Sequence, residues 1–139
     1  MGKLNIFLSI VLVVVIGTGA FLFLGKDAFG FGNENELSVE DIAELSIDTD
    51  VITTNLASNN FGVVQFNILL DTKTAKEELE QRKPEVRAAI ISIVAGFKKD
   101  QLTGRAGITN LEEELYEKLN KIVETGQVER VLVTEFKVQ

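Results

Sequence analysis

The hydropathy pattern opens with 21 uncharged residues from Leu4 to Leu24. A helix of that length rises roughly 30 Å, about the hydrocarbon thickness of a bilayer. The apolar run continues past the small residues 17–20, where a secretory signal peptide would be cut. The pattern therefore favours an uncleaved transmembrane helix over residues 4–24, with residues 1–3 as a short cytoplasmic tail.

A polar, glycine-containing stretch follows, and its composition predicts a juxtamembrane linker over residues 25–46. Phe29 and Phe31 interrupt it. Aromatic residues near a bilayer usually rest at the head-group level, and contact with a partner protein is the sharper alternative. Ser38, with Asp41 in the first turn, predicts a short helix within the linker.

Hydrophobic and polar residues alternate from Ile47 onward, which is typical of strands. Asn59 and Asn60 provide a turn between two such runs. The longer run places every second residue on one apolar face, namely Val64, Phe66, Ile68 and Leu70. The sequence therefore predicts an antiparallel hairpin with one buried face.

An amphipathic stripe at helical spacing then extends from Ala75 to Phe97. Thr74 and Glu77 form a capping-box pattern that predicts the start of this helix. Pro84 either bends one helix or begins a second one at its first turn. Because the apolar register continues across Pro84, we expect a single bent helix.

A second strip on the same segment consists of three small residues at spacing four, Ala88, Ser92 and Gly96. Small side chains allow another element to approach closely. Packing inside the domain is the favoured interpretation, and contact between protomers is the alternative.

The remainder predicts a polar loop over 98–108, a helix that begins at Thr109 or Asn110 and ends at Gly126, and a final strand. One face of that strand would carry Leu132, Thr134, Phe136 and Val138. The resulting order is strand, strand, helix, helix, strand. We therefore expect one α+β domain over residues 47–139, with helices on one side of a small sheet.

The charge is unevenly placed. Residues 27–71 contain nine carboxylates and no Lys or Arg, whereas residues 73–139 are balanced. Positive charge stays on the cytoplasmic side during insertion, so the domain should be extracytoplasmic. Anionic lipid would repel the acidic segment. A solvated spacer is its favoured interpretation, and a basic protein surface is the alternative neighbour.

The candidate chemistry is sparse. The chain has no cysteine and no histidine, which removes thiol chemistry and the usual acid–base group at neutral pH. Glu112, Glu113 and Glu114 are adjacent on a helix and point in different directions. Asp48 and Asp50 lack further oxygen ligands nearby in sequence. We therefore expect no enzyme activity, cofactor, metal or nucleic acid, and we expect protein partners.

Three blocks carry a resemblance to a known family: Ile52-Thr-Thr-Asn-Leu56, Arg82-Lys-Pro-Glu-Val-Arg-Ala-Ala-Ile-Ile-Ser-Ile93 and Thr134-Glu-Phe-Lys-Val-Gln139. Together with the N-terminal anchor, they resemble the flagellar basal-body protein family FliL over nearly the whole chain. The short tail before Leu4 departs from many relatives. The strand residues 61–70 also lack any basic side chain.

The resemblance implies a non-enzymatic accessory of the flagellar motor in the cytoplasmic (inner) membrane. Such proteins associate with the A and B subunits of the ion-driven stator, form rings around it and support torque and swarming. Their outer domain resembles the stomatin and prohibitin (SPFH) fold. The family offers no catalytic residues to transfer. Candidate contacts are Ala88, Ser92 and Gly96 between protomers, and Phe29 with Phe31 for a partner. A regulator of another envelope complex, such as a membrane protease, is the alternative.

Overall fold

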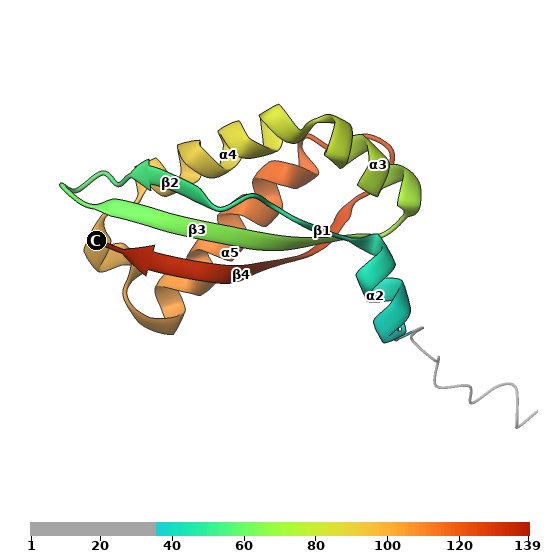
Figure 1. Ribbon diagram of the computed structural model, residues 1–139, viewed down its shortest axis with the longest axis horizontal. Coiled ribbons are helices and arrows are strands. Elements are labelled where there is room, and N and C mark those ends of the chain that lie inside the picture. The colour runs from blue at the N-terminus through green and yellow to red at the C-terminus, as the bar shows by residue number, and fades with distance from the viewer. Residues whose placement is uncertain (1–35) are drawn as a thin grey trace, which may run out of the picture. The chain divides into compact units, whose positions relative to one another are not determined.

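The computed structural model describes residues 36–139, and Leu4, Leu24, Phe29 and Phe31 lie outside them. Within residues 36–139, no helix is long and apolar enough to cross a membrane. The elements in Figure 1 are, in chain order, α2 (Val39–Leu45), β1 (Ser46–Asp48), β2 (Ile52–Asn55), β3 (Phe61–Leu70), α3 (Lys73–Gln81), α4 (Lys83–Gly96), the 3-10 helix η1 (Lys99–Leu102), α5 (Gly104–Asn120) and β4 (Val128–Val138). The α+β class is confirmed. The likeness to the SPFH fold stays a prediction.

The sheet is antiparallel throughout and is built around β3. β2 pairs with the first part of β3 and β1 with its later part, so these two short strands share one edge of it. β4 pairs along the other edge. The hairpin expected around Asn59 and Asn60 is therefore confirmed as β2 and β3 (Figure 1).

The core lies between one face of this sheet and the helices. Val64, Phe66, Ile68 and Leu70 are all buried to 0% exposure, which confirms the predicted apolar face of β3. Leu111, Leu115 and Leu119 of α5 are equally buried and belong to the same cluster. All buried hydrophobic residues of the described chain fall between Ile52 and Val131. The compact unit from Leu37 to Gln139 thus contains a core of its own.

The short helix α2 begins as the sequence predicts. Ser38 is its N-cap, and its hydroxyl accepts a hydrogen bond from Asp41 N–H at 3.1 Å. The Asp41 carboxylate in turn accepts bonds from the Ser38 hydroxyl and backbone N–H. These bonds hold the pKa of Asp41 below its usual range, with the hydroxyl as the larger cause.

Two predictions about the next helical segment are wrong. Thr72, and not Thr74, is the N-cap of α3, because its side chain accepts from Ala75 N–H at 3.2 Å. The segment is also two helices rather than one bent helix. The chain leaves helical geometry at Arg82, and Pro84 stands in the first turn of α4. Proline fits there because the first turn of a helix needs no N–H partner.

The start and end of α5 also differ from expectation. The helix begins at Gly104, so the predicted loop over 98–108 is largely helical, and neither Thr109 nor Asn110 is the cap. It ends at Asn120, well before Gly126. The start of α5 contains Gly107, a residue that the sequence pattern assigns to a loop, because the helix lies close to η1 there. A Cβ there would lie 2.6 Å from the backbone oxygen of Gln101, so the early turns of α5 press on η1.

The final strand does not keep one face throughout. Gln65 pairs with Glu135 and Phe66 with Val133, which leaves Thr134 as an extra residue in β4. Such a bulge reverses the alternation. Val131 and Val133 therefore face the core before the bulge, and Phe136 and Val138 do so after it, whereas Leu132 remains 38% exposed. The predicted face, Leu132, Thr134, Phe136 and Val138, is wrong in its first half.

Candidate partner-binding surfaces

The shared edge strand formed by β1 and β2 is interrupted at residues 49–51. Three residues there stand opposite two residues of β3, between the pairs Asp48–Asn67 and Ile52–Val64. The interruption keeps its hydrogen bonds. Thr49 N–H donates to the Phe66 carbonyl at 2.9 Å, and Phe66 N–H donates to the Thr49 hydroxyl at 3.0 Å. The backbone groups of Phe66 are thereby satisfied while the edge bends away from a regular ladder.

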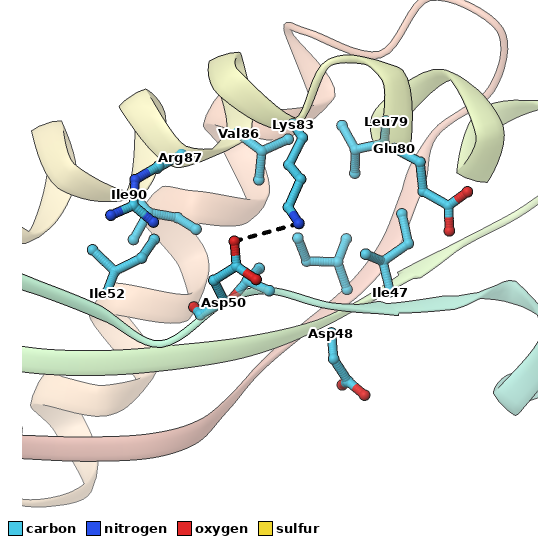
Figure 2. A pocket seen from close by; sticks show the side chains of 12 residues that line it. Ile47, Asp48, Asp50, Ile52, Leu79, Glu80, Lys83, Val86, Arg87 and Ile90 are labelled. Carbon is cyan, nitrogen blue, oxygen red and sulfur yellow. Dashed lines mark hydrogen bonds and ion pairs between the residues drawn. The ribbon is translucent and has the colours of Figure 1, made fainter.

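A groove opens between this interrupted edge and the helices α3 and α4 (Figure 2). Its volume is about 360 Å³, at the lower end of the sizes of ligand pockets. The floor is apolar and is made by Ile47, Ile52, Ile68, Leu79, Val86 and Ile90. Such a floor suits one or two hydrophobic side chains of a binding partner.

The rim of the groove is charged. Lys83 Nζ lies 3.3 Å from Asp50 Oδ2 across the mouth, and both side chains are more than 60% exposed. Arg87 lies at the end near Ile90, and Glu80 at the opposite end, beside Leu79 (Figure 2). The groove therefore has a basic end and an acidic end, with an exposed ion pair between them.

The small-residue strip of α4 lies on the outside of the domain. Ala88, Ser92 and Gly96 are all exposed, and a Cβ added to Gly96 would meet no atom within 4 Å. The favoured interpretation, packing inside the domain, is therefore wrong. A second, shallow hollow adjoins the strip between α4 and α5, lined by Ser92, Ile93, Gly96, Phe97, Gln101, Glu114 and Lys118. Contact between protomers through the strip stays a prediction.

The edge formed by β4 is partly closed by side chains of α5. Val133 N–H donates to the Glu112 carboxylate at 2.8 Å. Asn120 accepts from Val128 N–H at 2.8 Å and donates to the Val128 carbonyl at 3.3 Å. These contacts occupy groups through which an edge strand recruits another chain.

Glu78 of α3 holds the turn between α5 and β4 through hydrogen bonds. The Glu78 carboxylate accepts from Thr125 N–H and hydroxyl and from Glu124 N–H, at 2.6–3.1 Å. Arg82 Nε lies 3.0 Å from the same carboxylate. The hydrogen bonds from Thr125 are the main reason that the pKa of Glu78 is lowered. The pKa of Arg82 is raised, chiefly by its hydrogen bond to Glu124.

Three of the acidic residues considered for ion binding, Asp48, Asp50 and Glu112, have other partners. Asp48 accepts from the Asn67 amide at 2.9 Å, and Asp50 pairs with Lys83. Glu112 is held by Val133. Within residues 36–139, no group of three or more acidic, His or Cys side chains is placed to hold a metal ion.

Sequence reasoning missed the groove and the two oxygen acceptors, Thr49 and Glu112. The groove left one trace in the sequence: residues 47–55 stand opposite residues 61–68 of β3, a stretch one residue shorter. An extra residue in one strand is visible only once the pairing is known. Glu112 gave no signal, because its role depends on how α5 lies against β4.

Comparisons with known proteins agree with one another. The model of the family described as "Flagellar basal body-associated protein FliL" matches residues 47–139. A "Flagellar protein FliL" of Bacillus subtilis (strain 168) is 36% identical over 124 residues, which make up 89% of this chain and 87% of that protein. The matched residues include β2, β3, β4 and the helices between them, so the groove and the strip both lie within the matched region.

Proposed function

Because the chain belongs to the FliL family of flagellar basal body-associated proteins, it is an accessory protein of the flagellum, and we propose that it assembles with copies of itself beside the ion-driven stator. In that position it supports the active, torque-generating state of the stator in swimming and swarming. The A and B subunits of the stator are its partners. The family match is the observation that carries this proposal.

The proposal includes a membrane anchor. Residues 4–24 form a single transmembrane helix, with residues 1–3 in the cytoplasm and residues 47–139 outside the cytoplasmic membrane. The length of the uncharged run and the acidic character of residues 27–71 support this arrangement. Anchored copies share a two-dimensional surface, which raises their effective concentration for assembly.

Two features of α4 support assembly through its outer face. Ala88, Ser92 and Gly96 are exposed and small, so a neighbouring copy can approach the helix closely. The hollow beside them is lined by Ile93 and by two charged residues, Glu114 and Lys118. The exposed lining of this hollow is more polar than apolar, as at the rim of a protein interface.

An assembled scaffold acts on the stator by raising the fraction of stators in the active form. It must bind the active form of the stator more tightly than the inactive form, because equal affinity for both forms shifts nothing. The proposal therefore makes two separable claims. The first is association, and the second is a preference for one state of the stator.

Crosslinking in cells tests association. The chain contains no cysteine, so Ala88→Cys introduces a single reactive group on the strip, and Ala106→Cys, an exposed alanine of α5, is the matched control. We expect disulfide-linked dimers with Ala88→Cys and few with Ala106→Cys. Chemical crosslinking of the same membranes, followed by mass spectrometry, should recover stator subunits. Crosslinks between copies of this protein, without any crosslink to a flagellar protein, would favour the alternative function, a regulator of another envelope complex such as a membrane protease.

A bulky residue tests whether assembly matters for motility. Ala88→Trp should block close approach without disturbing the core, because position 88 is exposed. We expect swarming to fall toward the level of the deletion strain, whereas Ala106→Trp should swarm normally. Normal swarming of Ala88→Trp at wild-type abundance would exclude the strip as the interface.

A further inference from the structure

The outer edge of β4 is open in its second half. Phe61 and Gln139 exchange both backbone hydrogen bonds, so from residue 135 onward the odd-numbered residues of β4 bond to β3. The N–H and C=O groups of Phe136 and Val138 therefore point away from β3, and within residues 36–139 no strand lies beyond them (Figure 1). The first half differs, because side chains of α5 occupy outward groups there. Residues 134–138 are thus a free edge segment, to which another strand can be added.

The two faces of the free edge segment differ in character. Phe136 and Val138 are half-buried and pack against the core on the inner face. Glu135 and Lys137 alternate with them and are exposed on the outer face. Neither of these two charged side chains forms an ion pair with any residue of 36–139. A strand added here would therefore meet two partly covered apolar side chains and two charges without a counter-charge in the domain.

The order of these charges is self-complementary. In a symmetric antiparallel pair of strands, the residue on the two-fold axis stands opposite its own copy. With Phe136 on the axis, Glu135 of each copy stands opposite Lys137 of the other. Opposite charges in directly opposed positions stabilise a pair of strands, and like charges destabilise it. One contact in this register therefore contains two favourable charge pairs.

The neighbouring symmetric registers are unfavourable. An axis at Glu135 would place two glutamates opposite each other, and an axis at Lys137 would do the same with two lysines. An axis at Thr134 would extend the pairing into the half of β4 where Glu112 holds the N–H of Val133. Charge and access therefore select the register with residue 136 on the axis.

We propose that two copies of this protein join through the free edge segment of β4, as an antiparallel pair with Phe136 on the two-fold axis. Phe136 exchanges two backbone hydrogen bonds with its own copy, because the outward groups at the axis belong to a hydrogen-bonded pair. The paired segment is short, so the contact forms between anchored copies, whose shared membrane surface raises their effective concentration. This inference rests on the proposed assembly and adds to it a two-fold contact outside the α4 strip.

Paired cysteines in the full-length, membrane-embedded protein test the contact. Glu135→Cys and Lys137→Cys are expressed together on differently tagged copies and oxidised mildly. Residues that oppose each other next to a hydrogen-bonded pair have Cα atoms about 4.5 Å apart, which a disulfide can span. We expect the mixed dimer to be at least about fivefold more abundant than the dimer between Glu135→Cys and Glu129→Cys, at an exposed position in the first half of β4.

The outcomes separate this contact from the assembly on which it rests. A mixed dimer at the control level, with Ala88→Cys dimers still present, would refute the β4 contact and leave the assembly intact. Absence of both kinds of dimer would count against the assembly itself, and the β4 contact would fall with it. Dimers of Glu135→Cys alone that were as abundant as the mixed dimer would indicate another register and contradict the assigned one.

Reversal of charge tests the pairing of Glu135 with Lys137. Cysteines introduced as Thr134→Cys and Val138→Cys, which oppose each other in this register, report on the contact. Glu135→Lys in both copies turns two attractive pairs into two repulsive ones and should reduce this reporter dimer about two- to tenfold. Lys137→Glu should do the same, and the two reversals together should restore the dimer.

These reversals should leave the domain folded, because both charged side chains are exposed. Single reversals without effect would refute the charge pairing. So would a double reversal that fails to restore the dimer.

Discussion

The two edges of β3 are irregular at the same place and are completed in different ways. Phe66 stands at the interruption of β1 and β2 on one edge and beside the Thr134 bulge of β4 on the other. On the first edge the Thr49 hydroxyl accepts the N–H of Phe66, and on the second the Glu112 carboxylate accepts the N–H of Val133. At each irregularity, therefore, a side-chain oxygen accepts a backbone N–H: Thr49 on one edge and Glu112 on the other.

What lies beyond each edge is different. On the β4 side, Glu112 and Asn120 of α5 occupy outward-facing backbone groups. On the side of β1 and β2, the chain bends away and leaves an apolar groove beneath an exposed ion pair. One edge is therefore partly closed by α5, whereas the other remains available to a partner.

Substitution of Phe66, which stands between the two irregular edges, should cause the largest loss of stability. Phe66 is fully buried, and its N–H and C=O groups both bond to Thr49 at the interrupted edge. Phe66→Ala should lower the free energy of unfolding by about 3–5 kcal/mol, since it removes a large core side chain. Urea unfolding of residues 37–139 measures this value. Leu132→Ala, at an exposed side chain of β4, is the control and should lower the free energy of unfolding by less than about 1 kcal/mol.

The hydroxyl of Thr49 is the next largest effect. Thr49→Val keeps the shape of the side chain and leaves the buried N–H of Phe66 without an acceptor, so it should cost about 1–3 kcal/mol of stability. Thr49→Ser should keep most of the hydrogen bond. If Thr49→Val were as stable as the exposed control Thr53→Val, the interruption would not depend on the hydroxyl.

The corresponding change on the β4 edge should be smaller. Glu112→Ala removes the acceptor of Val133 N–H, which is only half-buried and can turn to water, so we expect a loss of about 1 kcal/mol. Glu113→Ala, its exposed neighbour, should stay within about 0.5 kcal/mol of the parent. Equal losses for Thr49→Val and Glu112→Ala would remove the difference that we draw between the two edges.

The ion pair at the groove should matter least for stability. Asp50→Asn breaks an ion pair whose side chains are both well exposed. The free energy of unfolding, measured by thermal unfolding, should therefore change by no more than about 0.5 kcal/mol. A large loss of stability would indicate that the pair holds the fold together rather than the mouth of the groove.

Local patterns of the sequence predicted several elements correctly. The alternating residues of β3 identify its buried face, and Ser38 with Asp41 identifies the start of α2. Both rest on neighbours in the chain, so no distant contact is needed to interpret them. The motif blocks around Ile52, Pro84 and Thr134 likewise indicated the family to which the chain belongs.

Contacts between distant segments decided the rest. The alternation of β4 reverses at Thr134 because β3 offers no residue opposite it. The start of α5 depends on Gly107 packing against Gln101, and the exposure of Ala88, Ser92 and Gly96 depends on which side of α4 the sheet covers. The groove exists only where an interrupted strand meets α3 and α4. The sequence by itself determined the buried face of β3, the start of α2, the α+β class and the family. The tertiary structure decided the ends of the other elements and which surfaces remain open, because both depend on how the elements pack.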